Sequence, residues 1–107
     1  DYLKLKKKSI INAVTESLGS SEFELRLYGS RVDDHKKGGD IDLLLISKDT
    51  ESRKIFEKLK PKILAKIDFY LEEQEKIDLT ITARDDIKKD PFLSLIIEKS
   101  ILLADKF

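Results

Sequence analysis

The order of apolar and polar residues divides the first half of the chain into one helix and two strands. Within residues 2–18, apolar residues recur three, four and seven positions apart, the spacing of a helix with one buried face; they are Leu3, Ile10, Ile11, Val14 and Leu18. Gly19 follows, at the point where many helices end on a left-handed residue. Residues 23–28 alternate between apolar and polar side chains, which predicts a half-buried strand. Residues 41–46 form a continuous apolar run, which predicts a central strand covered on both faces.

The second half of the chain predicts a long helix followed by a third strand. Residues 50 to about 73 carry apolar side chains four positions apart, namely Ile55, Leu59, Ile63 and Ile67. Pro61 lies inside this run, and because it removes a backbone donor it should kink the helix or split it in two. Residues 76–82 alternate again, as a strand would.

Capping residues mark the beginnings of two further helices. Residues 30–33 have the form of a capping box and predict a short helix that Gly38 and Gly39 must end. Asp90 suits an N-cap and Pro91 a first helical turn, so we expect a helix from Pro91 to about Ser100. Residues 101–104 either extend that helix or form a short closing strand.

Composition narrows the class of protein. The length of 107 residues predicts a single domain, residues 1–107. The 21 basic and 21 acidic residues balance, which argues against a general electrostatic grip on nucleic acid. The chain has no cysteine and one histidine, so neither a thiolate nor a His-rich metal site is expected. No apolar run approaches the ~20 residues that span a bilayer, and nothing resembles a secretory signal, so we expect a cytoplasmic protein without a membrane partner.

Carboxylates beside two of the predicted strands suggest metal chemistry. Asp40 and Asp42 lie two residues apart at the start of an apolar strand, so both should point to one face with Cα atoms roughly 6.5 Å apart. Asp78 opens the next strand and becomes a third member if the two strands are neighbours. Converging carboxylates repel one another unless a cation lies between them, and Mg²⁺ prefers oxygen ligands. Two bridged metal ions are a standard arrangement for phosphoryl or nucleotidyl transfer.

A possible phosphate site precedes the carboxylates. Gly29 permits a tight turn with no side chain to block a phosphate. Ser30 offers a hydroxyl and a backbone amide at a predicted helix N-terminus, where anions are favoured. Arg31 adds positive charge.

Each of these features has an ordinary structural explanation when taken alone. A single Asp-x-Asp pair is usually a solvated turn, a Gly-Ser pair is usually a turn and a cap, and an isolated Asp78 is usually a surface residue. The order of the three, each attached to an apolar strand, favours the functional interpretation. His35 is expected to be a solvated residue rather than a ligand, and the basic run from Lys4 to Lys8 is expected to be the solvated face of the first helix.

Three segments together resemble a known family: Leu-Tyr-Gly-Ser-Arg at 27–31, Gly-Gly-Asp-Ile-Asp-Leu-Leu-Leu-Ile at 38–46 and Lys-Ile-Asp-Leu at 76–79. They resemble the minimal nucleotidyltransferases of the DNA polymerase β superfamily, over nearly the whole chain. The spacer between Ser30 and Asp40 holds nine residues, where many relatives have ten. The resemblance implies an α+β fold in two layers, with a small mixed sheet of three to four strands flanked by helices.

The resemblance also implies an activity and roles for individual residues. It implies transfer of a nucleotide, most often AMP from ATP, with two Mg²⁺ ions. Gly29, Ser30 and Arg31 would contact the nucleotide. The carboxylates Asp40 and Asp42 would hold Mg²⁺, and Asp78 would complete the second metal site and help to activate the acceptor hydroxyl.

The length of the chain bears on where the acceptor of the nucleotide is expected. Larger relatives carry a helical domain for the acceptor, and no residues remain here for one, so we expect either an acceptor on a second chain or an open site. The resemblance suggests a helical HEPN-type toxin, with this chain as the antitoxin that adenylylates a tyrosine of its partner. A binding module that neutralises such a partner without chemistry, and a small-molecule transferase of the aminoglycoside-modifying kind, stay open as alternatives. The oligomeric state, alone or with a partner, is also open.

Overall fold

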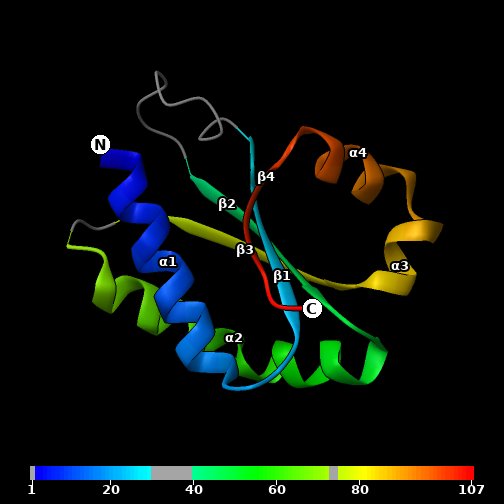
Figure 1. The fold of residues 1–107 in the computed structure, drawn as a ribbon, viewed down its shortest axis with the longest axis horizontal. Coiled ribbons are helices and arrows are strands. Elements are labelled where there is room, and N and C mark those ends of the chain that lie inside the picture. Colours follow the sequence, from blue (N-terminus) through cyan, green and yellow to red (C-terminus); the bar gives the residue numbers. More distant parts are fainter. Residues whose placement is uncertain (1, 30–39, 73–74) are drawn as a thin grey trace.

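A computed structural model of the protein describes residues 2–29, 40–72 and 75–107. The helices and strands follow the chain as α1 (Tyr2–Leu18), β1 (Phe23–Tyr28), β2 (Ile41–Ser47), α2 (Thr50–Tyr70), β3 (Ile77–Ala83), α3 (Arg84–Lys89), α4 (Pro91–Lys99) and β4 (Ile101–Asp105). Figure 1 shows α1 and α2 next to each other. The other strands run behind β4 in this view, and α3 and α4 lie on the opposite side of the picture from α1.

The four strands form one mixed sheet in the order β3-β2-β1-β4. Strand β1 pairs antiparallel with both β2 and β4, whereas β2 and β3 are parallel. The α+β class and the mixed sheet expected from the resemblance are therefore confirmed. The residues after α4 form a strand rather than a continuation of the helix, and this strand completes the edge of the sheet next to β1.

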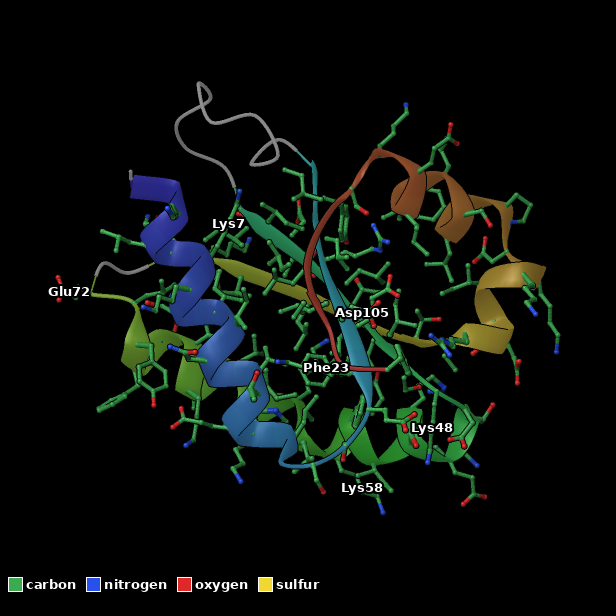
Figure 2. The ribbon with its side chains drawn as sticks, in the orientation of Figure 1. Lys7, Phe23, Lys48, Lys58, Glu72 and Asp105 are labelled. Atoms are coloured by element: carbon green, nitrogen blue, oxygen red, sulfur yellow. The ribbon has the colours of Figure 1, made fainter. Side chains whose placement is uncertain are left out.

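The main core lies between one face of the sheet and the helices α1 and α2. Phe23, Leu25 and Leu27 of β1 point to this face, in keeping with the alternation of the strand, and all three are buried. Residues of α1, α2, β2 and β3 join them in one apolar cluster, which includes Ile10, Val14, Leu43, Phe56, Ile63 and Leu79. Lys58 of α2 and Glu72, which follows the end of α2, carry exposed charged side chains (Figure 2).

Helix α2 is a single element although it contains Pro61. Of the two effects expected of this proline, a kink or a split, the split is wrong. Asp49 caps the helix by accepting a hydrogen bond from the Ser52 amide at 2.8 Å. Phe56 before the proline and Ile63 after it are both buried in the core, so packing holds the two halves in one helix despite the missing donor.

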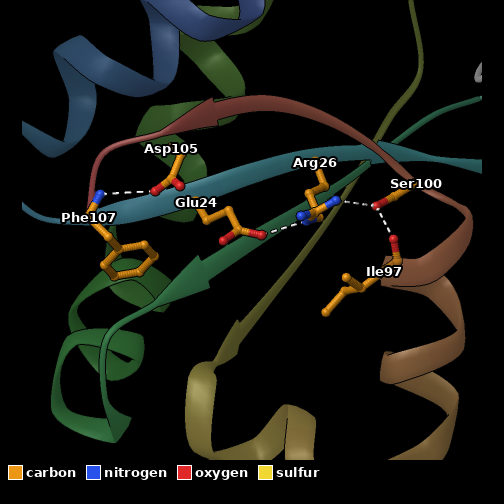
Figure 3. A network of polar contacts seen from close by, with 6 residues as sticks. All are labelled: Glu24, Arg26, Ile97, Ser100, Asp105 and Phe107. Atoms are coloured by element: carbon orange, nitrogen blue, oxygen red, sulfur yellow. Dashed lines mark hydrogen bonds and ion pairs between the residues drawn. The ribbon is translucent and has the colours of Figure 1, made fainter.

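The second face of the sheet carries the polar residues of the alternating strands. Arg26 of β1 lies on this face; its guanidinium binds Glu24 at 2.5 Å and donates to the Ser100 hydroxyl at 3.0 Å. Ser100 stands between α4 and β4, and its hydroxyl also bonds to the Ile97 carbonyl (Figure 3). These bonds fix the turn from α4 into β4 against the middle of the sheet. Asp90 caps α4, and Pro91 begins it, as predicted.

Two features of the sequence were interpreted differently from the structure. Helix α3 was not predicted, because its six residues include one apolar side chain, Ile87, and so show no period. Lys6 was expected on the solvated face of the first helix, but it is buried and forms an ion pair with Glu75. That pair joins the N-terminal half of α1 to the residues that precede β3.

Candidate active site

The ladder of the sheet brings the predicted carboxylates together. Asp42, in the second position of β2, is the register partner of Asp78 on the parallel strand β3. Neighbouring strands are about 4.8 Å apart, so the two side chains leave the same face from adjacent strands. Asp40 lies two residues before Asp42, and the Ile41 amide bonds to the Lys76 carbonyl at 2.9 Å, which holds the beginning of β2 against the residues before β3. The condition on which Asp78 was expected to join the cluster, that its strand lies next to that of Asp42, is met.

The electrostatics of Asp42 show that the other two carboxylates act on it. Burial, followed by the negative charges of Asp78 and Asp40, raises the pKa of Asp42 above the ordinary range of an aspartate. Asp78 is exposed, and the side chain of Asp40 keeps 41% of its accessible surface. One partly buried carboxylate is thus flanked by two that are open to solvent. An approaching divalent cation would relieve this repulsion.

Lys76 adds a positive charge at the edge of the cluster. Its ammonium lies 3.8 Å from Oδ2 of Asp40, and 82% of its side chain is exposed. An ion pair in water contributes little to stability, so Lys76 is free to leave Asp40 when another charged group arrives.

The backbone of Gly29 lies in close contact with the carboxylate of Asp42. The glycine has φ +80°, a conformation that side chains disfavour, and a Cβ at this position would lie 2.2 Å from Oδ2 of Asp42. The backbone of Gly29 therefore approaches the carboxylate more closely than any other residue would allow. The sequence predicted a glycine that makes room for a phosphate; the structure shows that it also makes room for Asp42.

Two predicted nucleotide contacts, Ser30 and Arg31, lie outside the described residues, as do the short helix expected from Ser30 and the predicted loop residue His35. Their roles stay predictions. Gly29 stands directly before them, at the end of β1 that carries the carboxylate cluster.

The donor set of the site fits a hard divalent cation, although a complete cage is not formed. Within residues 2–29, 40–72 and 75–107, no three acidic or histidine side chains converge closely enough to hold an ion by themselves. Mg²⁺ in proteins is commonly bound through one or two carboxylates and the phosphates of a substrate. Asp42 with Asp40 or Asp78 supplies that number of carboxylates, so the residues fit an ion that arrives with a nucleotide.

Sequence reasoning missed two residues of this site, Tyr28 and Thr80. Tyr28 is the register partner of Asp42 on the other side of β2, and its hydroxyl lies 3.4 Å from that of Thr80 on β3. The alternation of β3 places Thr80 on the face of Asp78. The sequence signal for Tyr28 is the alternation of β1, which places this residue on the second face of the sheet directly before the glycine.

Comparison with known proteins agrees with this geometry. The sequence pattern of the nucleotidyltransferase domain family matches residues 7–103, most of the chain. The chain belongs to this family. Its members transfer nucleotidyl groups, and they generally use a nucleoside triphosphate and a divalent metal ion. The match includes all three carboxylates and Gly29, and it supports a minimal nucleotidyltransferase of the DNA polymerase β superfamily.

A solved structure shares the fold of this nucleotidyltransferase. It is the 1.40 Å crystal structure of a candidate nucleotidyltransferase from Sulfolobus solfataricus. The two chains superpose with a TM-score of 0.55 and 15% sequence identity, over 97% of this chain and 80% of the other. A comparison with curated proteins gives no match. Among the described residues, no helix is long and apolar enough to cross a membrane.

Proposed function

We propose that the protein is a Mg²⁺-dependent adenylyltransferase, which moves AMP from ATP to a hydroxyl group of a partner protein. The observation that carries the proposal is the register of β2 and β3, which sets Asp42 beside Asp78 with Asp40 two residues away. A carboxylate whose pKa is raised by burial and by acidic neighbours, as that of Asp42 is, is suited to bind a cation. Asp40, Asp42 and Asp78 would hold Mg²⁺, which supplies positive charge to the phosphates during transfer.

The proposed reaction is a displacement at the α-phosphorus of ATP. The oxygen of the acceptor hydroxyl forms a bond to this phosphorus, the bond from the phosphorus to the bridging oxygen breaks, and pyrophosphate leaves. A carboxylate at the edge of the cluster receives the proton of the hydroxyl. Asp78 suits this step because it is exposed and so accessible to an acceptor. Lys76, which is exposed beside Asp40, can turn toward the phosphates.

The proposed acceptor is a tyrosine of a helical HEPN-type toxin, for which this protein would act as antitoxin. The open position of the cluster supports a large acceptor, since Asp78 and the side chain of Asp40 are accessible from the edge of the sheet. A deep, closed pocket would instead favour a small molecule. The partner itself rests on the family resemblance.

The test uses ATP labelled on the α-phosphate, Mg²⁺ and the product of the adjacent gene. Wild-type protein should transfer label to the partner, and mass spectrometry should place one or more AMP groups on a tyrosine. Asp42→Asn and Asp78→Asn should transfer none, whereas Asp68→Asn, an exposed site on α2, should behave as wild type.

Other outcomes identify other functions. A partner that binds without accepting label from any nucleoside triphosphate would contradict the enzymatic proposal. If Asp42→Asn still neutralised a toxic partner fully, the protein would be a binding antitoxin. Label on an aminoglycoside rather than on protein would identify a small-molecule transferase.

A further inference from the structure

The residues of three adjacent strands form rows on the second face of the sheet. One row consists of Tyr28, Asp42 and Asp78, and the next consists of Arg26, Leu44 and Thr80. The hydroxyl of Tyr28, from the first row on β1, lies 3.4 Å from the hydroxyl of Thr80, in the second row on β3. The tyrosine side chain must therefore cross β2 diagonally, between Asp42 and Leu44.

On this path the phenol ring lies between a polar and an apolar part of the sheet face. On one side lie the carboxylates of the first row, and on the other lies Leu44, which is fully buried. The ring thus lies beside Asp42, which is partly buried. Tyr28 is the immediate neighbour of Asp42 in the ladder.

Gly29 confines the same carboxylate from a second direction. Oδ2 of Asp42 occupies the space in which a Cβ of Gly29 would lie. The aromatic residue that ends β1 and the glycine that follows it therefore restrict the orientations that Asp42 can adopt. A ligand held in one orientation before the ion arrives loses less conformational entropy on binding.

We propose that Tyr28 is a positioning residue of the transfer site, whose phenol, tied to Thr80 across β2, holds Asp42 in the orientation that binds the metal ion. This inference rests on the proposed function. It assigns to Tyr28 and Thr80 an effect on metal affinity rather than contact with the reacting atoms. It also predicts that the two hydroxyls act as one unit.

The experiment measures Mn²⁺ binding by electron paramagnetic resonance on the full chain, with a non-hydrolysable ATP analogue present. The variants are Tyr28→Phe and Thr80→Val, each of which removes one hydroxyl while keeping its shape, and the double variant. Thr82→Val is the matched control, because Thr82 lies on the same face of β3, one row farther from the carboxylates. Its hydroxyl is removed in the same way at a buried site.

Each single variant should weaken Mn²⁺ binding by about three- to fivefold, the effect of one hydrogen bond between neutral groups. The double variant should be no weaker than either single one, since both changes break the same link. Thr82→Val should bind Mn²⁺ as wild type even if its melting temperature falls. In steady-state transfer, Tyr28→Phe should lower kcat at limiting Mg²⁺ and recover when Mg²⁺ is raised.

Three results would overturn the proposal. If Tyr28→Phe bound Mn²⁺ as tightly as wild type, the Tyr28 hydroxyl would have no role in metal binding. Additive losses of Mn²⁺ affinity in the double variant would show that Tyr28 and Thr80 act separately. An equal loss of Mn²⁺ affinity in Thr82→Val would show that the effect comes from general destabilisation of the protein. In all three cases the wild type still binds Mn²⁺, so the proposed function stands; wild type that binds no Mn²⁺ contradicts both.

Discussion

Replacing Asp42 by asparagine should make the metal-free protein more stable while it removes metal binding. Asp42 lies one strand spacing from Asp78, about 4.8 Å between Cα atoms, and about 6.5 Å along the strand from Asp40. Two like charges about 5–7 Å apart in a water-exposed setting repel by roughly 0.6–0.8 kcal/mol, and salt near 0.1 M roughly halves this. Both repulsions, together with the partial burial of the charge, disappear in Asp42→Asn.

The expected gain is therefore about 1 kcal/mol at pH 7, or an increase of roughly 4–6 °C in melting temperature for a domain of this size. The sign follows from the pKa. A carboxyl whose pKa is raised in the folded state costs stability increasingly as the pH rises above its pKa in the unfolded state, and the cost vanishes in acid, where Asp42 is protonated in both states. Wild type and variant should thus converge below the ordinary pKa of an aspartate, about 4.

Thermal unfolding by circular dichroism in EDTA provides the measurement, repeated with Mg²⁺ and an ATP analogue. With these ligands the wild type should gain stability by mass action, and the variant should gain little. Asp68→Asn, an exposed change on α2, should shift the metal-free stability by no more than about 0.5 kcal/mol. A variant less stable than wild type in EDTA at pH 7 would refute the reasoning, because Asp42 would then be a structural anchor rather than a strained ligand.

Further predictions concern a glycine and two helix caps. Gly29→Ala should destabilise the fold by more than about 1 kcal/mol and abolish Mn²⁺ binding, whereas Gly19→Ala, which has φ +62° but no atom within 4 Å of its Cβ, should cost only the backbone strain; equal losses in thermal melts would contradict the contact with Asp42. Asp49→Ala should lower the melting temperature at neutral pH, because the bond from Ser52 lowers the pKa of Asp49 in the folded state. That difference should disappear as the pH falls through the pKa of the folded state, and a difference that persists in strong acid would contradict the charged cap. Asp90→Ala should destabilise the protein by about 1 kcal/mol in urea unfolding, since its carboxylate accepts the Phe92 amide at 2.9 Å; an unchanged midpoint would argue against this cap.

The sequence predicts the regular elements well where one face of an element is buried. Residues 23–28 alternate because β1 packs Phe23, Leu25 and Leu27 against the helices. The spacing of these apolar residues therefore indicates which side chains are buried. Helix α3 has no such face, since none of its residues is buried. Lys6 is buried because Glu75, distant in the sequence, lies within reach of its ammonium. Such a pair leaves no local pattern, so the sequence indicated only a charged helix surface.

The candidate site divides in the same way. The sequence identified Asp40, Asp42 and Asp78 because each begins an apolar strand, but their proximity required the order of the strands, which spacing alone does not determine. Tyr28 carries no chemical signature on its own. Its importance arises from two pairings, with Asp42 in the ladder and with Thr80 through its hydroxyl. Both depend on β2 lying between β1 and β3.

The Gly-Ser and Asp-x-Asp segments form a single structural unit, and the ladder rather than the spacer holds it together. Six consecutive pairs, from Phe23 with Ser47 to Tyr28 with Asp42, fix β1 against β2. A shift of one residue would turn every side chain of a strand to the opposite face, so Leu25, Leu27, Leu43 and Leu45, all buried, prevent such a slip. Gly29 must therefore meet Asp42 whatever connects the two strands. The register of the ladder, rather than the length of the nine-residue spacer between Ser30 and Asp40, places Asp42 beside Gly29.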